Sequence, residues 1–199
     1  MEKEKKLTKG LVQVYTGTGK GKTTAALGQA YRAIGHGFQV CFIQFLKGSS
    51  YAGELFTSQR LQPHIDFYQF GRGCPFSSLI RSGLRQCNGC GECFYKDNQK
   101  KEENRELATM AMQFTKEVLK KDKYDLLVLD EISNALRYDF IDPAEIVTLI
   151  HNKPCHVELI LTGRGLPAEI LEVADLVSEI KAIKHPLQKG IKSRRGIEY

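Results

Sequence analysis

Residues 11–26 read LVQVYTGTGKGKTTAA, an apolar run followed by a glycine-rich turn and an alanine-rich stretch. Backbone N–H groups at the start of a helix approach a polyphosphate closely only where no side chain intervenes, which glycines allow. The pattern therefore predicts a phosphate-binding loop, in which Lys22 brings positive charge to the phosphates and the Thr23 hydroxyl binds Mg²⁺. It departs from the consensus G-x-x-x-x-G-K-[ST] at Thr16, where the consensus has glycine. The predicted nucleotide-binding residues of this loop are Thr16, Gly17, Thr18, Gly19, Lys20, Gly21, Lys22, Thr23 and Thr24.

Strand-like runs alternate with helical patterns along most of the chain. Runs such as LLVLD at 126–130 and VELIL at 157–161 are almost continuously apolar, which is typical of parallel strands that are covered by helices on both faces. The sequence thus predicts a three-layer α/β fold of the P-loop NTPase-like type with a mostly parallel central sheet. We expect strands at 11–15, 39–46, 64–70, 125–130, 157–161 and 176–183, and helices at 22–34, 102–121, 143–151 and 167–174.

Length, hydrophobicity and charge narrow the class of protein. A chain of 199 residues that is 42% hydrophobic predicts one domain over 10–199, preceded by a flexible solvated tail at 1–9. No apolar stretch approaches the ~20 residues that cross a bilayer, and the N-terminus lacks a signal peptide, so we expect a cytoplasmic protein. The net charge is +6, but no nucleic-acid-binding motif accompanies the basic residues, so a phosphate ligand and a solvated face explain it more simply.

Further functional groups are expected on the loops that leave the carboxyl ends of the strands, where the phosphate-binding loop also lies. Asp130 and Glu131 end an apolar strand, and such acids hold Mg²⁺ beside a phosphate loop. Arg164 stands between Gly163 and Gly165 after another apolar strand. Its planar guanidinium is suited to a phosphate group, and the glycines would allow a close approach.

A cysteine-rich insertion is expected at about 71–98. Cys87, Cys90 and Cys93 have C-x₂-C-x₂-C spacing, and Cys74 would add a fourth sulfur. The spacing is similar to that of iron–sulfur ligands, whereas structural zinc usually has two separated C-x₂-C pairs. A [4Fe–4S] cluster or Zn²⁺ is the favoured interpretation, and free or redox-active thiols are the alternative.

The order of these motifs resembles the P-loop type of cob(I)alamin adenosyltransferase, also called corrinoid adenosyltransferase. The resemblance covers nearly all of the chain outside the tail and the cysteine-rich insertion. Its most specific parts are the doubled glycine–lysine GKGK at 19–22 and the ending KHPLQKGIKSRRGIEY at 184–199. The matching segments are VYTGTGKGKTTAALGQAYRAIGHG at 14–37, CFIQFLKG at 41–48, FYQFGRG at 67–73, LLVLDEISNALRYDFI at 126–141 and the stretch from 160 to 199.

The resemblance implies transfer of the 5′-deoxyadenosyl group of ATP to Co(I) of a reduced corrinoid, with release of triphosphate. ATP would lie in the loop in the sense opposite to that in most P-loop enzymes. The loop would then hold a leaving group, and Co(I) is already a strong nucleophile, so positioning and charge neutralisation are the protein's main tasks. By position, Lys22 would contact phosphates, Thr23 and Glu131 would serve Mg²⁺, and Arg164 would contact phosphate or substrate.

The resemblance also implies how the corrinoid is prepared. Family members displace the lower axial ligand of Co(II) with aromatic side chains that follow the segment matching 71–73. Here Phe76 keeps one aromatic residue, whereas Cys74 stands where the other is expected. A homodimer and a reducing electron-transfer protein such as a flavodoxin or ferredoxin are also implied, without nucleic acid or membrane.

Two other functions are compatible with the motifs. A P-loop nucleoside kinase with a structural metal site would need a carboxylate base beside its acceptor hydroxyl and would make ADP. A redox-sensing nucleotide switch would bind nucleotide without corrinoid-dependent turnover.

Overall fold

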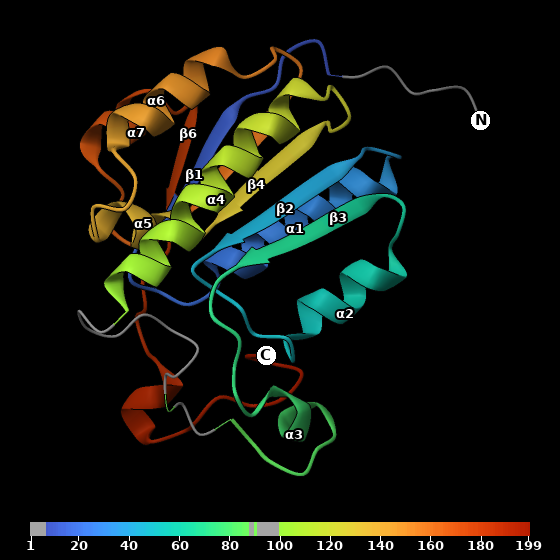
Figure 1. The fold of residues 1–199 in the computed structure, drawn as a ribbon, viewed down its shortest axis with the longest axis vertical. Helices are drawn as coiled ribbons and strands as arrows, with labels where there is room; N and C mark the ends of the chain where they lie inside the picture. Colours follow the sequence, from blue (N-terminus) through green and yellow to red (C-terminus); the bar gives the residue numbers. More distant parts are fainter. Residues whose placement is uncertain (1–6, 88–89, 91–99) are drawn as a thin grey trace.

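The computed structural model describes residues 7–87, 90 and 100–199, which form a six-stranded sheet with helices on both faces (Figure 1). Every strand pairing in this sheet is parallel, in the order β3-β2-β4-β5-β1-β6. This confirms the predicted three-layer α/β fold. The strands are β1 (Val12–Thr16), β2 (Val40–Phe45), β3 (Ile65–Phe70), β4 (Leu126–Asp130), β5 (Glu158–Thr162) and β6 (Leu176–Glu179).

The helices include all four that the sequence predicts, with boundaries that differ by one or two residues. Three short helices and one 3₁₀ turn were not predicted: α2 (Gly53–Arg60), α3 (Ser77–Arg81), α5 (Ile132–Arg137) and η1 (Pro186–Lys189). Short segments of this kind carry too few turns for a clear apolar period. The predicted helices are α1 (Lys22–Gly35), α4 (Lys101–Lys120), α6 (Pro143–Asn152) and α7 (Ala168–Glu172).

The central strands β2, β4 and β5 are mostly apolar because successive side chains enter two different cores. Phe42, Val128 and Ile160 pack with the alanines of α1, Ala26, Ala30 and Ala33, on one face. Their chain neighbours Ile43, Leu129 and Leu161 pack on the other face with residues of α4, α5, α6 and α7. Alternation of this kind with apolar residues on both sides is what a doubly covered parallel sheet requires.

A smaller region lies beyond the carboxyl ends of the strands. It contains α3 and the C-terminal segment from 185 to 199, which lie beside each other in Figure 1. The Arg195 guanidinium donates to the Arg81 carbonyl at 3.3 Å, and the Tyr51 and Tyr199 rings meet edge to face with centroids 5.2 Å apart. The phosphate-binding loop leaves β1 at the same end of the sheet. The loop and the smaller region around α3 therefore lie at one end of the molecule, where they could form two halves of one site. None of the described helices is long and apolar enough to cross a membrane.

Candidate active site

The loop between β1 and α1 is closed on itself by Lys22. Only 5% of Lys22 is exposed, and its Nζ donates to the carbonyl oxygens of Gly17 at 3.0 Å and of Gly19 at 2.8 Å. Gly17 and Gly21 have φ of 102° and 117°, values that side-chain-bearing residues rarely adopt. Gly21 is the N-cap residue of α1, whose N-terminus has no side-chain cap and no acidic residue in its first turn. The helix therefore presents uncapped N–H groups and a positive dipole end, as an anion site requires.

The chain that follows β6 holds the loop from outside. The Gly19 N–H donates to the Ile180 carbonyl at 2.7 Å, and the Ile180 N–H donates to the Thr16 carbonyl at 2.8 Å. A Cβ atom on Gly17 would lie 2.4 Å from that carbonyl oxygen of Ile180, closer than real contacts allow. The strand predicted at 176–183 accordingly ends at Glu179, because the next residue turns to bind the loop instead of extending the sheet.

Asp130 joins the loop to the sheet. Its carboxylate is fully buried, and its Oδ1 accepts from the hydroxyls of Thr23 at 2.9 Å and Thr162 at 2.7 Å. Its Oδ2 accepts from Gln44 Nε2 at 2.9 Å. The sequence placed Glu131 with Thr23 at the Mg²⁺ site, whereas the structure brings Asp130 to the Thr23 hydroxyl. Asp130 ends β4 with its side chain pointing inward, and Glu131 follows outside the strand.

Glu131 has a left-handed backbone with φ of 58°, and its N–H donates to Thr162 Oγ1 at 3.0 Å. Burial raises the pKa of its carboxyl, and repulsion from Asp130 raises it further. Three cations oppose this shift: Lys22, Lys47 and Arg164. Glu131 therefore lies within the electrostatic reach of the phosphate loop even though it makes no bond to Thr23.

Two glutamines of the site were missed by the sequence analysis. Gln69 Nε2 donates to Gln44 Oε1 at 2.8 Å, and Gln44 in turn donates to Asp130. The three residues come from the adjacent strands β3, β2 and β4. The available signal in the sequence was a glutamine, Gln44, inside the apolar run CFIQF at 41–45. The structure buries it fully, and a buried amide needs hydrogen-bond partners.

Arg164 is exposed in the loop that follows β5. Its N–H donates to Ser133 Oγ at 2.9 Å, and a Cβ atom on Gly163 would lie 2.1 Å from the same oxygen. Glycine is thus needed for α5 to approach this loop.

Burial lowers the pKa of Lys22, and the positive charge of Arg164 lowers it further, whereas the negative charges of Glu131 and Asp130 oppose this shift. Arg164 and Lys22 are therefore close enough to interact electrostatically. Of the other predicted loop residues, Thr16 ends β1, and Thr18, Lys20 and Thr24 are exposed.

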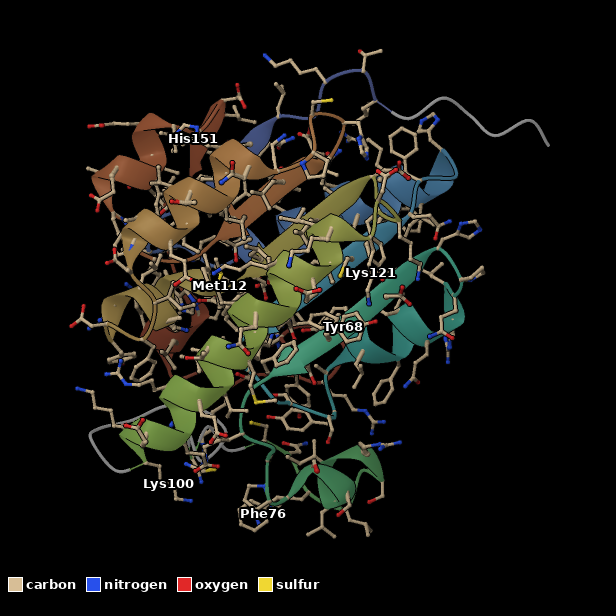
Figure 2. All side chains as sticks on the ribbon, turned by 45° about the horizontal axis from the view of Figure 1, so that its top comes forward. Tyr68, Phe76, Lys100, Met112, Lys121 and His151 are labelled. Atoms are coloured by element: carbon tan, nitrogen blue, oxygen red, sulfur yellow. The ribbon has the colours of Figure 1, made fainter. Side chains whose placement is uncertain are left out.

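Phe76 lies outside the sheet, at the start of α3 (Figure 2). It is half-buried against a small apolar cluster that contains Tyr51, Cys74 and Ile80. The Arg85 guanidinium carbon lies 3.6 Å from the centre of its ring, a close cation–π contact. Phe76 therefore belongs to the smaller region beyond the carboxyl ends of the strands, the end of the sheet at which the phosphate loop also lies.

The cysteines are brought only partly together. Cys74 is buried, and Cys87 is half-buried with its Sγ accepting from the Tyr51 hydroxyl at 3.5 Å. Cys90 is exposed, and Cys93 lies outside the described residues. Within 7–87, 90 and 100–199, no group of three histidine, cysteine or acidic side chains is placed to hold a metal ion. The described thiols thus do not form a metal centre by themselves.

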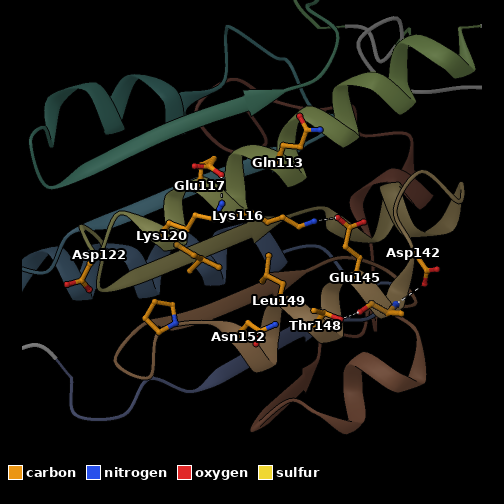
Figure 3. Close-up of a pocket in the computed structure, with 13 residues that line it drawn as sticks. Gln113, Lys116, Glu117, Lys120, Asp122, Asp142, Glu145, Thr148, Leu149 and Asn152 are labelled. Carbon is orange, nitrogen blue, oxygen red and sulfur yellow. Dashed lines mark hydrogen bonds and ion pairs between the residues drawn. The ribbon is translucent and has the colours of Figure 1, made fainter.

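A large hollow of about 1110 Å³ lies elsewhere, between α4 and α6 (Figure 3). Its wall includes the ion pair between Lys116 and Glu145 and none of the predicted site residues. It extends to Asp122 and Pro154, which precede β4 and β5 and so lie toward the amino ends of the strands. Size alone therefore does not identify the site, and the convergent polar groups lie at the other end of the sheet.

We predict that Glu131→Gln stabilises the protein in the absence of nucleotide and divalent metal at neutral pH. Because the folded-state pKa of Glu131 is raised, its ionised form is disfavoured on folding; this cost begins as the pH rises past the unfolded-state pKa and is complete above the folded-state pKa. The gain in melting temperature over wild type should appear at pH 7 and vanish as the pH falls below the unfolded-state value. Glu169→Gln, an exposed change on α7, is the control. A gain that is equal at pH 4 and pH 7 would contradict the assignment.

The sequence is similar to those of known proteins over nearly the whole chain. Residues 8–199 match the family model described as ATP:corrinoid adenosyltransferase BtuR/CobO/CobP. A corrinoid adenosyltransferase of Sinorhizobium sp. is 38% identical over 192 residues, covering 96% of this chain and 81% of the relative. The corrinoid adenosyltransferase of Escherichia coli K12 is 35% identical over 192 residues, covering 96% of this chain and 86% of the relative.

The fold is also found in a more distant solved structure. The KaiC-like protein PH0186 of Pyrococcus horikoshii superposes with a TM-score of 0.52 at 17% identity, covering 89% of this chain and 75% of that protein. This likeness concerns the fold alone. The family match over nearly the whole chain favours the adenosyltransferase interpretation over the kinase and the redox switch. The chain belongs to the ATP:corrinoid adenosyltransferase family.

Proposed function

We propose that this protein transfers the 5′-deoxyadenosyl group of ATP to the Co(I) ion of a reduced corrinoid and releases triphosphate. The observation that carries the proposal is the closed phosphate loop, in which a buried Lys22 and the uncapped start of α1 converge. Family membership supplies the identity of the second substrate.

The reaction is a displacement at carbon, so it needs no covalent bond between a protein residue and the substrate. The electron pair of Co(I) forms the Co–C5′ bond while the C5′–O bond breaks, and its electrons leave with the triphosphate oxygen. Cobalt is thereby formally oxidised to Co(III), and no proton has to be moved. The requirements are an in-line approach of cobalt to C5′ and stabilisation of the charge that develops on the leaving oxygen.

The loop residues meet the second requirement. Lys22 would exchange its two carbonyl partners for phosphate oxygens, and the N–H groups at the start of α1 would donate to the same anion. Arg164 would approach from the end of β5 and add a planar set of donors. Lys22, the N–H groups of α1 and Arg164 would all bind the leaving triphosphate. Their stabilising contribution would therefore grow as the C5′–O bond breaks and negative charge develops on the leaving oxygen.

The oxygen atoms beside the loop fit Mg²⁺, because they are hard ligands grouped around Thr23. The Thr23 hydroxyl is held by the Asp130 carboxylate at 2.9 Å, and Glu131 is the next carboxylate along the chain. Thr23, with Glu131 directly or Asp130 through water, would hold the ion. When bound, Mg²⁺ supplies additional positive charge to the phosphates.

The direct test is anaerobic incubation with ATP, Mg²⁺ and a chemically reduced corrinoid, followed by detection of a light-sensitive cobalt–carbon product and of triphosphate. We predict that Lys22→Ala lowers turnover at least about a hundredfold, the scale of losing one preorganised electrostatic stabiliser. Lys121→Ala, an exposed change that follows α4 before β4, is the control. Near-normal turnover in Lys22→Ala, or formation of ADP in place of triphosphate, would contradict the proposal.

We further propose that Phe76 fills the space of the displaced lower axial ligand when the corrinoid enters as Co(II). Its half-buried ring at the start of α3 packs against Arg85 and the small cluster around Tyr51, and it is not part of the main core. Phe76→Ala is expected to lose most activity with Co(II) corrinoid and a mild reductant, yet much less when Co(I) is supplied. Equal losses in the two assays would reject this role.

Metal binding by the cysteine segment is a prediction that is independent of the proposed transfer reaction. If Cys74, Cys87, Cys90 and Cys93 bind one [4Fe–4S] cluster or Zn²⁺, protein purified without oxygen should contain that metal, and a cluster should also absorb visible light. Cys90→Ser should remove the metal, whereas Cys155→Ser, an exposed cysteine after α6, should not. Fully active protein without metal would eliminate the metal centre. The electron donor, a flavodoxin or ferredoxin, the homodimer and the cytoplasmic location stay predictions.

A further inference from the structure

A basic cavity of about 380 Å³ lies between α3 and the C-terminal segment. Four of its lining side chains are cationic, and none of those described is acidic: Arg85, Lys192, Arg194 and Arg195. Of these four, only Arg194 has an acidic partner among the residues that the structure describes, namely Glu198. Most of these side chains are exposed, so water and salt screen their mutual repulsion, but together they give the cavity an excess of positive charge that favours an anionic ligand.

The cavity adjoins both halves of the candidate site. Arg85 lines it and also covers the ring of Phe76 at 3.6 Å. On another wall, Arg194 binds Glu198, whose carboxylate also accepts from Lys20 of the phosphate loop. These hydrogen bonds, from Arg194 above all, lower the pKa of Glu198 to about 2, so the connection persists throughout the neutral range. The cavity is thus tied to the phosphate loop through one carboxylate and touches the proposed corrinoid side through one arginine.

We propose that this cavity binds an anionic group on the edge of the corrinoid, an inference that rests on the proposed function. The corrin ring carries many amide side chains, which are neutral, so an anion distinguishes one corrinoid from another. Two sources have the same chemistry: the phosphodiester of a complete corrinoid's nucleotide loop, and the free carboxylates of an incompletely amidated ring. Arginine and lysine side chains bind either kind of oxygen with charge-assisted hydrogen bonds.

The test is equilibrium binding of three Co(II) corrinoids in the presence of ATP, measured by calorimetry. Cobalamin carries the phosphodiester, cobyrinic acid a,c-diamide carries free carboxylates, and cobinamide carries neither. Lys192→Gln removes a cavity charge that has no acidic partner among the described residues, and it should weaken binding of at least one anionic corrinoid about tenfold. Binding of cobinamide should change less than twofold. The corrinoid that loses affinity identifies the source of the anion.

Lys189→Gln is the matched control, because Lys189 is exposed, lies three residues away in η1 and does not line the cavity. It should leave all three affinities within twofold of wild type. An equal loss for cobinamide and the anionic corrinoids, an equal effect of Lys189→Gln, or a weakened affinity for ATP alone would overturn the inference. If the binding pattern holds but no cobalt–carbon product forms, the proposed reaction fails while the anion site stands.

Discussion

The buried carboxylate of Asp130 is the constraint on which the site depends. It is fully enclosed at the end of the central strand β4, and it accepts hydrogen bonds from Thr23, Thr162 and Gln44. An ionised group taken out of water is very costly unless it is paired or hydrogen-bonded, whereas each hydrogen bond to a charged group contributes about 1.5–3 kcal/mol. Its three donors come from α1, β5 and β2. One carboxylate therefore fixes the start of the phosphate-binding helix against two strands.

Fixing α1 in this way determines what the loop before it can do. The helix also packs close to the sheet through alanines, so its N-terminus is held at a defined height above the strand ends. The loop must then make a sharp turn from β1 into α1, which the positive φ angles of Gly17 and Gly21 allow. Ile180 fills the outer side of that turn with its carbonyl. The loop is thus preformed, which spares ATP the free-energy cost of ordering it.

The fold was predictable because short, local patterns in the sequence determine its strands and its first helix. Uninterrupted apolar runs such as 126–130 indicate strands buried on both faces, and the glycine–lysine turn places β1 directly before a helix. The partner of Thr23 was not predictable in the same way. Asp130 and Glu131 are neighbours in sequence, and only the direction of the strand end decides which of them points to the loop. Gln44 and Gln69 meet Asp130 through the strand order β3-β2-β4, which no local pattern contains.

The phosphate loop and the region around α3 are stabilised by different interactions. This difference explains why the sequence predicted the first in detail and not the second. The phosphate half rests on a continuous core and a parallel ladder, whose contacts are numerous and apolar. The half around α3 rests on a small cluster and a few polar links, among them Arg195 to the Arg81 carbonyl and Lys20 to Glu198. Few buried contacts mean a lower local free energy of opening. The region around α3 can therefore open more easily than the phosphate loop, to which it is linked by the Glu198 carboxylate, and this is the property that the proposed binding of a large corrinoid beside α3 would require.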